Sequence, residues 1–416
     1  MNSTTNKRKI INDPVFGFIN FPSETIFDLV EHPYLQRLRR IKQLGLSSLV
    51  FPGANHTRFE HTIGALHLMR QAIDVLREKK VSISTDEAEA VSIAILLHDI
   101  GHGPFSHALE STIVSGIGHE DLSLMLMEEL NREFGGKLTM AIEIFKDEYP
   151  RHFLHQLISG QLDMDRLDYL RRDSFYSGVV EGMIGCDRII KMLNVADDRL
   201  VVDKKAIYSV ENFLIARRLM YWQVYLHKTV LAAEFMLINI LKRAKELVSN
   251  GNELYAPPQL LWLLKHGFSK ENLKINDNKS IMIKNFVALD DSDILSSIKV
   301  WSTHPDPVLS WLSTAIINRK LFKIKISDHQ FSEKKAEVLK EQLNTKFNIP
   351  KKETSYFVFQ GEITNSAYEP SSEEIFIIYN NGKRADFEKA SDINLSVLSK
   401  TVKKHFFCYP KELTLK

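Results

Sequence analysis

The sequence predicts a mainly α-helical protein with a small α+β appendage at its C-terminal end. Between about residues 29 and 247, apolar residues recur at helical spacing, for example over 64–76, 87–97, 122–134 and 210–247. After about residue 319, apolar and charged residues alternate instead, as they do in half-exposed strands. The 416 residues suffice for one large domain with an appendage. We therefore expect a helical domain over 1–319 and a small α+β domain over 320–416.

The elements follow in order along the chain. Residues 88–97 (AEAVSIAILL) predict a buried helix, which Gly101, Gly103 and Pro104 must end. Residues 248–275 contain a Pro257-Pro258 pair and predict a loop that leads into short helices. The sequence of the appendage predicts a strand at Phe322, Ile324 and Ile326, followed by a helix over 332–343 that is capped by Ser332. Two further strands, over 356–359 and 375–379, and a hairpin turn at Asn381-Gly382 are predicted after this helix.

Composition excludes several classes of protein. Lys and Arg number 54 and Asp and Glu 52, so the net charge of +2 does not indicate a protein that coats nucleic acid. Cys186 and Cys408 are too few for a disulfide framework or a thiolate zinc site. No run of about eighteen apolar residues predicts a membrane span, and the start MNSTTNKRK lacks the apolar core of a signal peptide. We expect a cytoplasmic protein that does not bind membranes.

The most informative segment is 96–107 (LLHDIGHGPFSH), where His98 and Asp99 end the apolar run. Neighbouring helical residues point about 100° apart, so this pair converges on one ion most easily at a helix end. An unpaired carboxylate in apolar surroundings costs several kcal/mol and needs a cation or a hydrogen-bond network. On this segment alone, a metal ligand pair and a structural hydrogen-bonded pair both remain open.

Two further segments favour the metal. Residues 55–64 add His61, and residues 161–173 add Asp165, which gives the order H…HD…D on helices. This order resembles the HD superfamily of metal-dependent phosphohydrolases, and the resemblance implies an all-helical catalytic core at about 30–230. The implied ligands are His61, His98, Asp99 and Asp165. Such a mixed nitrogen and oxygen set suits Mn²⁺, Fe²⁺, Zn²⁺, Ni²⁺ or Mg²⁺, and a second Mg²⁺ could accompany a bound triphosphate.

Residues 33–45, 50–54 and 58–62 narrow the resemblance. They are similar to the deoxynucleoside triphosphate (dNTP) triphosphohydrolase branch of the superfamily, which includes the SAM-and-HD-domain protein of animals. The similarity runs from about Lys9 to about Lys228 and continues more weakly to about residue 325. It implies that a dNTP is hydrolysed to the deoxynucleoside and inorganic triphosphate by attack of water on the α-phosphorus. No Walker-type glycine loop is present, so side chains and metal must hold the phosphates.

The substrate contacts are also implied by the resemblance. Asp165, Tyr169 and Asp173 lie four residues apart and share one helix face. Arg166 stands where the branch usually has a lysine, which keeps the charge but changes its geometry. We expect Asp163 and Asp168 to support the ligands or to be solvated. The implied substrate contacts are Gln43, Tyr169 and Asp173 near the sugar 3′-hydroxyl, Tyr225 against a ribose 2′-hydroxyl, Arg58, Arg166 and Arg217 on the phosphates, and Leu44.

Three histidines are candidates for proton transfer, because histidine titrates near neutral pH. His102, His107 and His119 occupy positions that in the branch approach the α-phosphate and the leaving oxygen. Glu110 could orient His107 from three residues away, although relatives usually have an aspartate there. The sequence does not decide which histidine acts.

Regulation is a further expectation from the resemblance. Regulated members form oligomers with nucleotides bound between subunits, so a homo-oligomer, dimer or tetramer, is expected. Lys9, Gln36 and Arg39 resemble parts of that effector site, while Glu31 stands where an aspartate reads guanine. The C-terminal appendage could serve oligomerisation or regulation. Two alternatives remain: a phosphoesterase for another nucleotide or a nucleic-acid end, and a nucleotide-sensing or nucleic-acid-binding protein.

Overall fold

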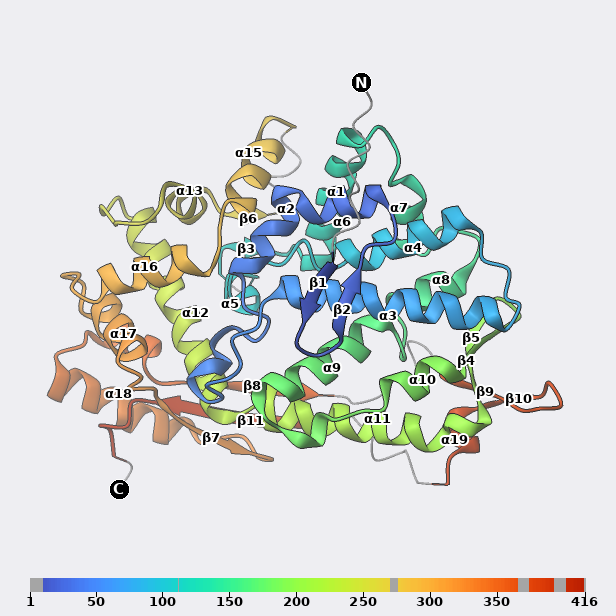
Figure 1. Cartoon of the computed structure of the whole chain (residues 1–416). Helices are drawn as coiled ribbons and strands as arrows, with labels where there is room; N and C mark the ends of the chain where they lie inside the picture. Colours follow the sequence, from blue (N-terminus) through green and yellow to red (C-terminus); the bar gives the residue numbers. More distant parts are fainter. Residues whose placement is uncertain (1–9, 111, 270–275, 366–373, 393–401, 415–416) are drawn as a thin grey trace.

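Helices make up most of the molecule (Figure 1), which confirms the predicted mainly α class. The computed structural model describes residues 10–110, 112–269, 276–365, 374–392 and 402–414. The described part starts with a hairpin of two strands, followed by a series of short helices. These elements are β1 (Ile10–Asp13), β2 (Gly17–Asn20), α1 (Glu24–Glu31), α2 (Pro33–Gln36), and the 3₁₀ turns η1 (Arg37–Arg40) and η2 (Gly45–Leu49).

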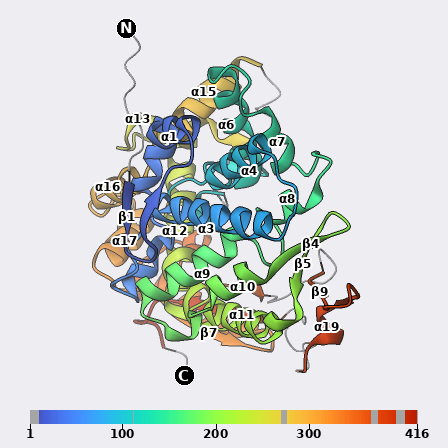
Figure 2. The same ribbon diagram turned by 45° about the vertical axis from the view of Figure 1, so that its right-hand side comes forward.

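Three helices form the centre of the fold: α3 (Arg58–Glu78), α4 (Thr85–Leu97) and α9 (Met164–Ser177). Helix α3 packs against both α4 and α9, and Figures 1 and 2 show it between them. A reciprocal cap starts α4, since the Ser84 hydroxyl accepts from the Glu87 N–H and the Glu87 carboxylate accepts from the Ser84 N–H. Helix α4 ends at Leu97, as predicted, with His98 as its C-cap.

The other helices surround this centre. Along the chain, α4 is followed by four helices before α9 begins: α5 (Ser106–Glu110), α6 (His119–Glu133), α7 (Thr139–Phe145) and α8 (His152–Gln156). After α9 come η3 (Val180–Gly182), α10 (Cys186–Met192), η4 (Lys204–Ala206), α11 (Ile207–Met220), the π-helical turn η5 (Tyr221–Tyr225), α12 (Lys228–Ser249), α13 (Pro258–His266), α15 (Asn276–Val287), α16 (Asp291–Trp301) and α17 (Pro307–Ile317).

The C-terminal part is α+β, as predicted, but it shares a sheet with the helical part. A four-stranded sheet has the order β10-β9-β5-β4, in which β9 lies parallel to β5. Figure 1 shows these strands at the right-hand edge of the molecule. A second sheet has the order β7-β11-β8 and is antiparallel. The elements are β4 (Leu193–Ala196), β5 (Arg199–Asp203), β7 (Lys323–Ser327), α18 (Glu333–Phe347), η6 (Lys351–Tyr356), β8 (Phe359–Asn365), β9 (Phe376–Ile378), β10 (Arg384–Asp386), α19 (Phe387–Ala390), β11 (Val402–Tyr409), and the short parallel pair β3 (Val114–Ser115) and β6 (Phe268–Ser269).

Several predicted elements are confirmed, and two are wrong. The strand at 322–326, the helix after Ser332 and the hairpin at Asn381-Gly382 are present. The strand predicted over 356–359 is wrong, because 351–356 is a 3₁₀ turn and β8 begins only at Phe359. The helical segment predicted over 210–247 is broken: η5 ends it, and the chain turns by 56° before α12. His227 starts α12 by accepting from the Thr229 N–H.

A buried ionic cluster ties α12 to the C-terminal part. Arg243 donates to Asp306 at 2.5 and 3.1 Å and to Glu353 at 2.9 Å, and all three side chains are about nine-tenths buried. Its guanidinium helps to hold the pKa of Asp306 below its usual range, although burial acts in the opposite direction.

Replacing Arg243 by methionine should lower the free energy of unfolding by about 2–3 kcal/mol at neutral pH, because two buried carboxylates lose their cation. A carboxyl group whose pKa is lowered by folding contributes its full stabilisation at pH values above its unfolded-state pKa. This contribution is lost as the pH falls further, through its folded-state pKa. The difference between the two proteins should therefore shrink on acidification. Urea unfolding at pH 7 and at about pH 3, which is below the usual aspartate pKa of about 3.9, measures both effects. An equal difference at the two pH values would contradict the assignment.

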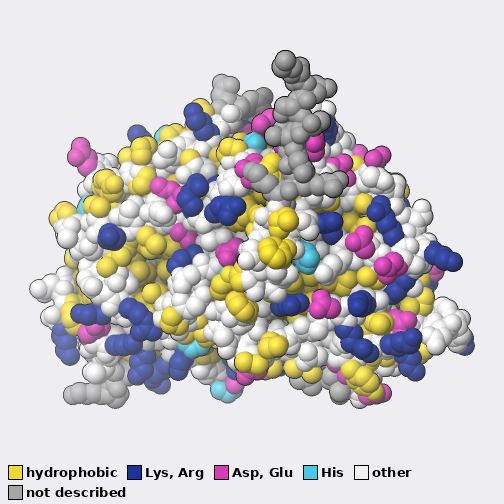
Figure 3. Space-filling view, viewed as in Figure 1, with side chains coloured by type: hydrophobic (Ala, Val, Ile, Leu, Met, Phe, Trp, Pro, Cys, Tyr) yellow, Lys and Arg dark blue, Asp and Glu magenta, His cyan; other side chains and the backbone are white. Residues whose placement is uncertain are grey.

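The surface carries both signs of charge. In Figure 3, lysine and arginine side chains are interspersed with aspartate and glutamate over the face shown. Among the residues that the structure describes, no single helix is both long and apolar enough to cross a membrane; only the bent pair 204–225 and 228–249 reaches that length and composition together.

Candidate metal centre and adjoining cavity

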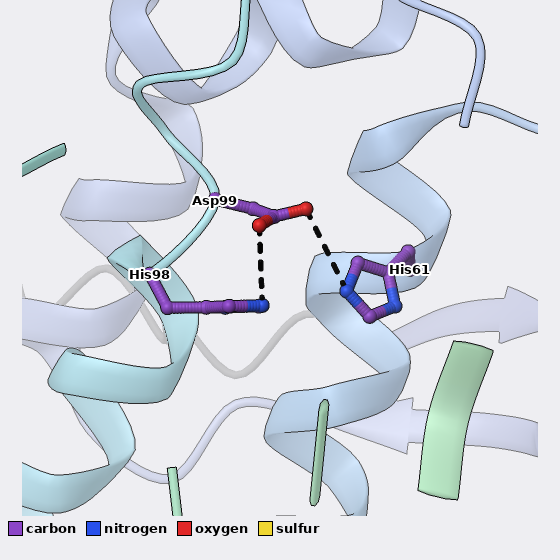
Figure 4. Close-up of side chains that lie close together, drawn as sticks. All are labelled: His61, His98 and Asp99. Carbon is purple, nitrogen blue, oxygen red and sulfur yellow. Dashed lines mark ion pairs between the residues drawn. The ribbon is translucent and has the colours of Figure 1, made fainter. Parts of the chain in front are cut away.

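The three central helices bring the four predicted metal ligands together. His61 lies one turn into α3, His98 and Asp99 follow the last residue of α4, and Asp165 lies in the first turn of α9. The Nε2 atom of His61 is 3.7 Å from Asp99 Oδ2 and 3.1 Å from Asp165 Oδ1. The Nε2 atom of His98 is 3.4 Å from Asp99 Oδ1 and 3.4 Å from Asp165 Oδ1. Figure 4 shows Asp99 facing both imidazoles.

Hydrogen bonds fix which ring nitrogen of each histidine is free. The Nδ1 atom of His61 lies 2.7 Å from Asp168 Oδ2, and the Nδ1 atom of His98 lies 2.6 Å from the carbonyl oxygen of Ile95. Both Nε2 atoms are buried and make no hydrogen bond within the described part of the chain. Metal-binding histidines typically donate from one nitrogen to a carboxylate or carbonyl and bind the ion with the other. The residues therefore fit a divalent metal ion.

The charge balance of the site supports the same interpretation. Burial lowers the pKa of His61, but Asp165 and Asp168 outweigh it and raise this pKa to about 10. Without a cation, the carboxylates would therefore keep a proton on His61. A bound divalent ion would supply positive charge in place of that proton, and it needs both imidazoles in the neutral form.

A second layer of side chains positions His61 from behind. Asp168 accepts from His61 and from Arg172, whose Nη1 also donates to Asp13 at 2.7 Å, and all four side chains are almost fully buried. Gly64 makes room for this layer, because a Cβ there would collide with Asp168 and Arg172. The predicted supporting role of Asp168 is thus observed. Asp163 instead caps α9 by accepting from the Arg166 N–H at 2.7 Å.

A cavity of about 460 Å³ adjoins the metal ligands, a size typical of small-molecule sites. Asp99 and Asp165 line it, together with residues from the segment 42–47, from α3, α5, α6, α9, η5 and α12, and from the turn that follows α4. Several predicted substrate contacts face it together with the metal ligands: Gln43, Leu44, Arg58, Tyr169, Asp173 and Tyr225.

One wall of the cavity is held rigidly by Asp173. Its Oδ1 lies 2.7 Å from His56 Nε2, and its Oδ2 accepts from the Tyr225 hydroxyl at 2.7 Å. The ring of Tyr225 meets Tyr169 edge to face at 6.1 Å, and His56 stacks on Tyr176. The phenol and the carboxylate are therefore oriented before any ligand binds.

The predicted proton-transfer residues lie beside Asp99. The rings of His102 and His119 stack at 4.0 Å, and His102 Nε2 lies 3.2 Å from Asp99 Oδ1. Burial and the charge of Arg58 lower the pKa of His102 to about 3. Burial also acts to lower the pKa of His119, but the hydrogen bond with Glu110 and the charge of Asp99 raise it overall. Gly101 allows this approach, since a Cβ there would collide with the backbone of α6 at His119.

Other predicted residues are placed differently or lie outside the described residues. Arg166 donates to Asp163 and to the carbonyl of Gly160, and Arg217 lies 3.4 Å from Gln161, so neither lines the cavity as described. Their phosphate contacts stay predictions. The side chain of His107 and the whole of Lys9 lie outside the described residues.

The two described residues of the predicted effector site lie together. Arg39 donates to the Gln36 side chain at 2.9 Å and covers the ring of Phe59 at 3.6 Å. The arrangement leaves their effector role a prediction.

Sequence reasoning missed two residues of the cavity region. His56 lies in the segment that contains His61, but nothing in its spacing indicated a contact with Asp173. Glu234 lines the cavity from α12, and its signal was a single carboxylate in the apolar run VLAAEFML.

Comparison with known proteins places this geometry in a family. The family described as HD domain matches residues 58–173, and the HD associated region matches residues 184–256. An uncharacterized protein of Bacillus subtilis, YwfO, is 31% identical over 99% of this chain and 94% of its own length. The chain belongs to the HD-domain phosphohydrolase family.

Other members of the HD-domain family agree in fold and in sequence. A crystal structure of a phosphohydrolase from Bacteroides thetaiotaomicron shares 57% identity, with a TM-score of 0.94 over 97% of this chain and all of that one. The deoxynucleoside triphosphate triphosphohydrolase SAMHD1 homolog of Dictyostelium discoideum is 32% identical, over 62% of this chain and 54% of its own length. The HD domain and the site together support a metal-dependent hydrolase.

Proposed function

We propose that this HD-domain protein hydrolyses dNTPs to the deoxynucleoside and inorganic triphosphate. The observation that carries the proposal is the single cavity shared by the ligands Asp99 and Asp165 and by the side chains suited to a deoxyribose, Tyr169, Asp173 and Tyr225. The similarity to relatives named as deoxynucleoside triphosphate triphosphohydrolases supports the same substrate class.

The charged side chains give the triphosphate one favourable location. Arg58 lines the cavity beside Asp99 and donates to it at 2.6 Å, which leaves the rest of its guanidinium available for phosphate oxygens. Lys42 also lines the cavity. His61, His98, Asp99 and Asp165 would hold the metal, which when bound polarises phosphate and water.

The sugar then meets the rigid wall around Asp173. Asp173 is an acceptor and Tyr169 a donor or acceptor for a 3′-hydroxyl, and Gln43 has a buried amide oxygen without a hydrogen-bond partner among the described residues. The ring of Tyr225 is held against this wall by its bond to Asp173. The wall therefore suits a sugar without a 2′-hydroxyl.

The proposed step breaks the bond between the α-phosphorus and the 5′-oxygen while water forms a new bond to that phosphorus. The departing 5′-oxygen takes up one proton, and the water loses one. His119 is our candidate donor, because Glu110 lies 3.7 Å from its Nδ1 and favours its protonated form. Arg58 stabilises the charge that develops on the phosphate.

The test is to incubate the purified, Mn²⁺-supplied protein with the four dNTPs, singly and mixed, and to resolve the products. Deoxynucleoside and triphosphate in equal amounts are expected from the parent and not from the Asp165→Ala variant. No turnover of any dNTP by metal-loaded protein would overturn the proposal and direct attention to other phosphoesters.

Tyr225 gives a prediction on sugar selectivity. Replacing it by alanine removes the bulk against a 2′-hydroxyl, so relative kcat/KM for a ribonucleotide against its deoxyribonucleotide should rise by about 10–100-fold. Tyr225→Phe keeps the bulk and loses only the bond to Asp173, so it should retain most of the selectivity. Competition assays with both nucleotides measure the ratio, and equal ratios in all three proteins would contradict the role of Tyr225.

Assembly and activation belong to the same proposal. We propose a homo-oligomer in which a nucleotide effector binds near Gln36 and Arg39, with the C-terminal part contributing to assembly or regulation. The mixed-dNTP arm tests activation, since turnover in the mixture alone would indicate an effector. Sedimentation with and without nucleotide measures the subunit number.

A further inference from the structure

Helix α12 presents one carboxylate to the cavity between apolar neighbours. Leu231, Glu234 and Leu237 all line the cavity, and their spacing of three residues places them on one face of the helix. Helix α12 packs against η2 and α5, which add Leu46 and Ala108 to the lining, and Phe105 just before α5 adds a third apolar side chain. None of the four metal ligands comes from α12. This part of the wall is therefore a largely apolar surface with a single charged group.

Glu234 has no hydrogen-bond or ion-pair partner among the residues that the structure describes. Among the described residues that line the cavity, the other carboxylates are occupied: Asp99 and Asp165 face the histidines, and Asp173 accepts from Tyr225. Burial is the cause that raises the pKa of the Glu234 carboxyl to about 7, with no charge or hydrogen bond from the described residues acting on it. A partly desolvated carboxylate without a partner destabilises the fold, and a ligand that supplies donors removes this cost.

Charge determines which end of a nucleotide can approach Glu234. A triphosphate is repelled by a carboxylate and is attracted by Arg58 and Lys42, which line the cavity together with the metal ligands Asp99 and Asp165. The sugar occupies the wall around Asp173. The nucleobase, which is flat and largely apolar, is the part left to pack against Leu231, Leu237 and Phe105.

We propose that Glu234 reads the nucleobase and selects guanine, an inference that rests on the proposed dNTP hydrolysis. An ionised carboxylate offers two acceptor oxygens and no donor. Guanine presents two adjacent donors, N1–H and the 2-amino group, which match these oxygens in a two-point contact. Adenine and cytosine place an acceptor beside their amino group, and thymine places carbonyl oxygens beside its N–H. Only guanine satisfies both oxygens of Glu234 at once.

The experiment compares dGTP with dITP, which lacks only the 2-amino group. Measurements at pH 8 keep Glu234 ionised, since its pKa is about 7. In the parent protein, kcat/KM for dGTP should exceed that for dITP by about tenfold or more, because the second hydrogen bond is lost with dITP. In Glu234→Gln this ratio should fall to about one, since the amide NH₂ faces a donor of guanine. Glu246→Gln makes the same chemical change on α12, outside the cavity, and should keep the parental ratio.

The outcomes separate this inference from the proposed function. A parent protein that hydrolyses no dNTP overturns both. A parent that hydrolyses dNTPs with a dGTP:dITP ratio near one, or a ratio unchanged in Glu234→Gln, overturns the assignment of Glu234 alone. Glu234→Gln should melt no lower than the parent, because it removes an unpaired charge. Glu234→Asp provides a second variant, in which the shorter side chain keeps the charge and should also lower the ratio.

Discussion

Replacing Asp165 by asparagine should reduce dNTP hydrolysis by about a thousandfold or more and abolish tight binding of the metal. The change removes one negative charge from the set that faces both imidazoles, at 3.1 Å from His61 and 3.4 Å from His98. A metal supplies several kcal/mol of charge stabilisation in phosphoryl chemistry, and about 4 kcal/mol corresponds to a thousandfold in rate. Product formation and metal content per chain, measured by elemental analysis, test the two halves of the prediction.

The variant should stay folded, which separates loss of metal from loss of structure. Asparagine has the volume of aspartate, and Asp165 is partly exposed in the first turn of α9. The free energy of unfolding without metal should therefore fall by only about 1–3 kcal/mol, because protonated His61 loses one of its two carboxylate partners. Asp187→Asn makes the same change at an exposed position on α10 and should keep full activity. Full metal content together with full activity in Asp165→Asn would exclude Asp165 as a ligand.

Replacing Asp168 by alanine should destabilise the fold by about 3 kcal/mol and weaken metal binding by about 10–100-fold. The buried Arg172 keeps its bond to Asp13 but loses all three bonds to Asp168, and the Nδ1 atom of His61 loses its partner. Breaking a buried ion pair is strongly destabilising because a charge is left without its partner. Loss of a carboxylate behind a metal-binding histidine typically lowers metal affinity by this factor.

Two measurements on Asp168→Ala distinguish these effects. Urea unfolding of metal-free protein reports the structural cost, and competition with a chelator reports the affinity for Mn²⁺. Asp187→Ala, with its exposed side chain, should change neither quantity. Parental stability of the metal-free variant would contradict the buried network, whereas parental Mn²⁺ affinity would contradict the positioning of His61 by Asp168.

Features that depend only on neighbouring residues, such as helix ends and the face on which a helical residue lies, could be predicted from the sequence. The helix end at Leu97 follows from the glycines and proline after it, and this end lets His98 and Asp99 face one point. The shared face of Asp165, Tyr169 and Asp173 follows from helical spacing, and all three line the cavity. The strand at Lys323–Ser327 follows from simple alternation.

The remaining features depend on contacts between distant segments. His56 meets Asp173 across 117 positions of the chain, and no spacing rule links them. Arg166 was expected on phosphate, but Asp163 in the preceding turn competes for its charge. The break after Tyr225 was missed because 210–247 is apolar at helical spacing on both sides of it, and only the π-helical turn and the His227 cap reveal the bend.

The parallel pairing of β5 with β9 determines when the four-stranded sheet can form during synthesis of the chain. Val201 pairs with Phe376, so β5 leaves the ribosome long before its neighbour has been synthesised. Until then, one edge of the β4–β5 hairpin has no partner strand, and such edges are templates for aggregation. Contacts this distant in the chain also slow folding. We therefore expect a prematurely terminated chain that lacks β9 to aggregate more readily than the full chain, because the β5 edge stays unpaired.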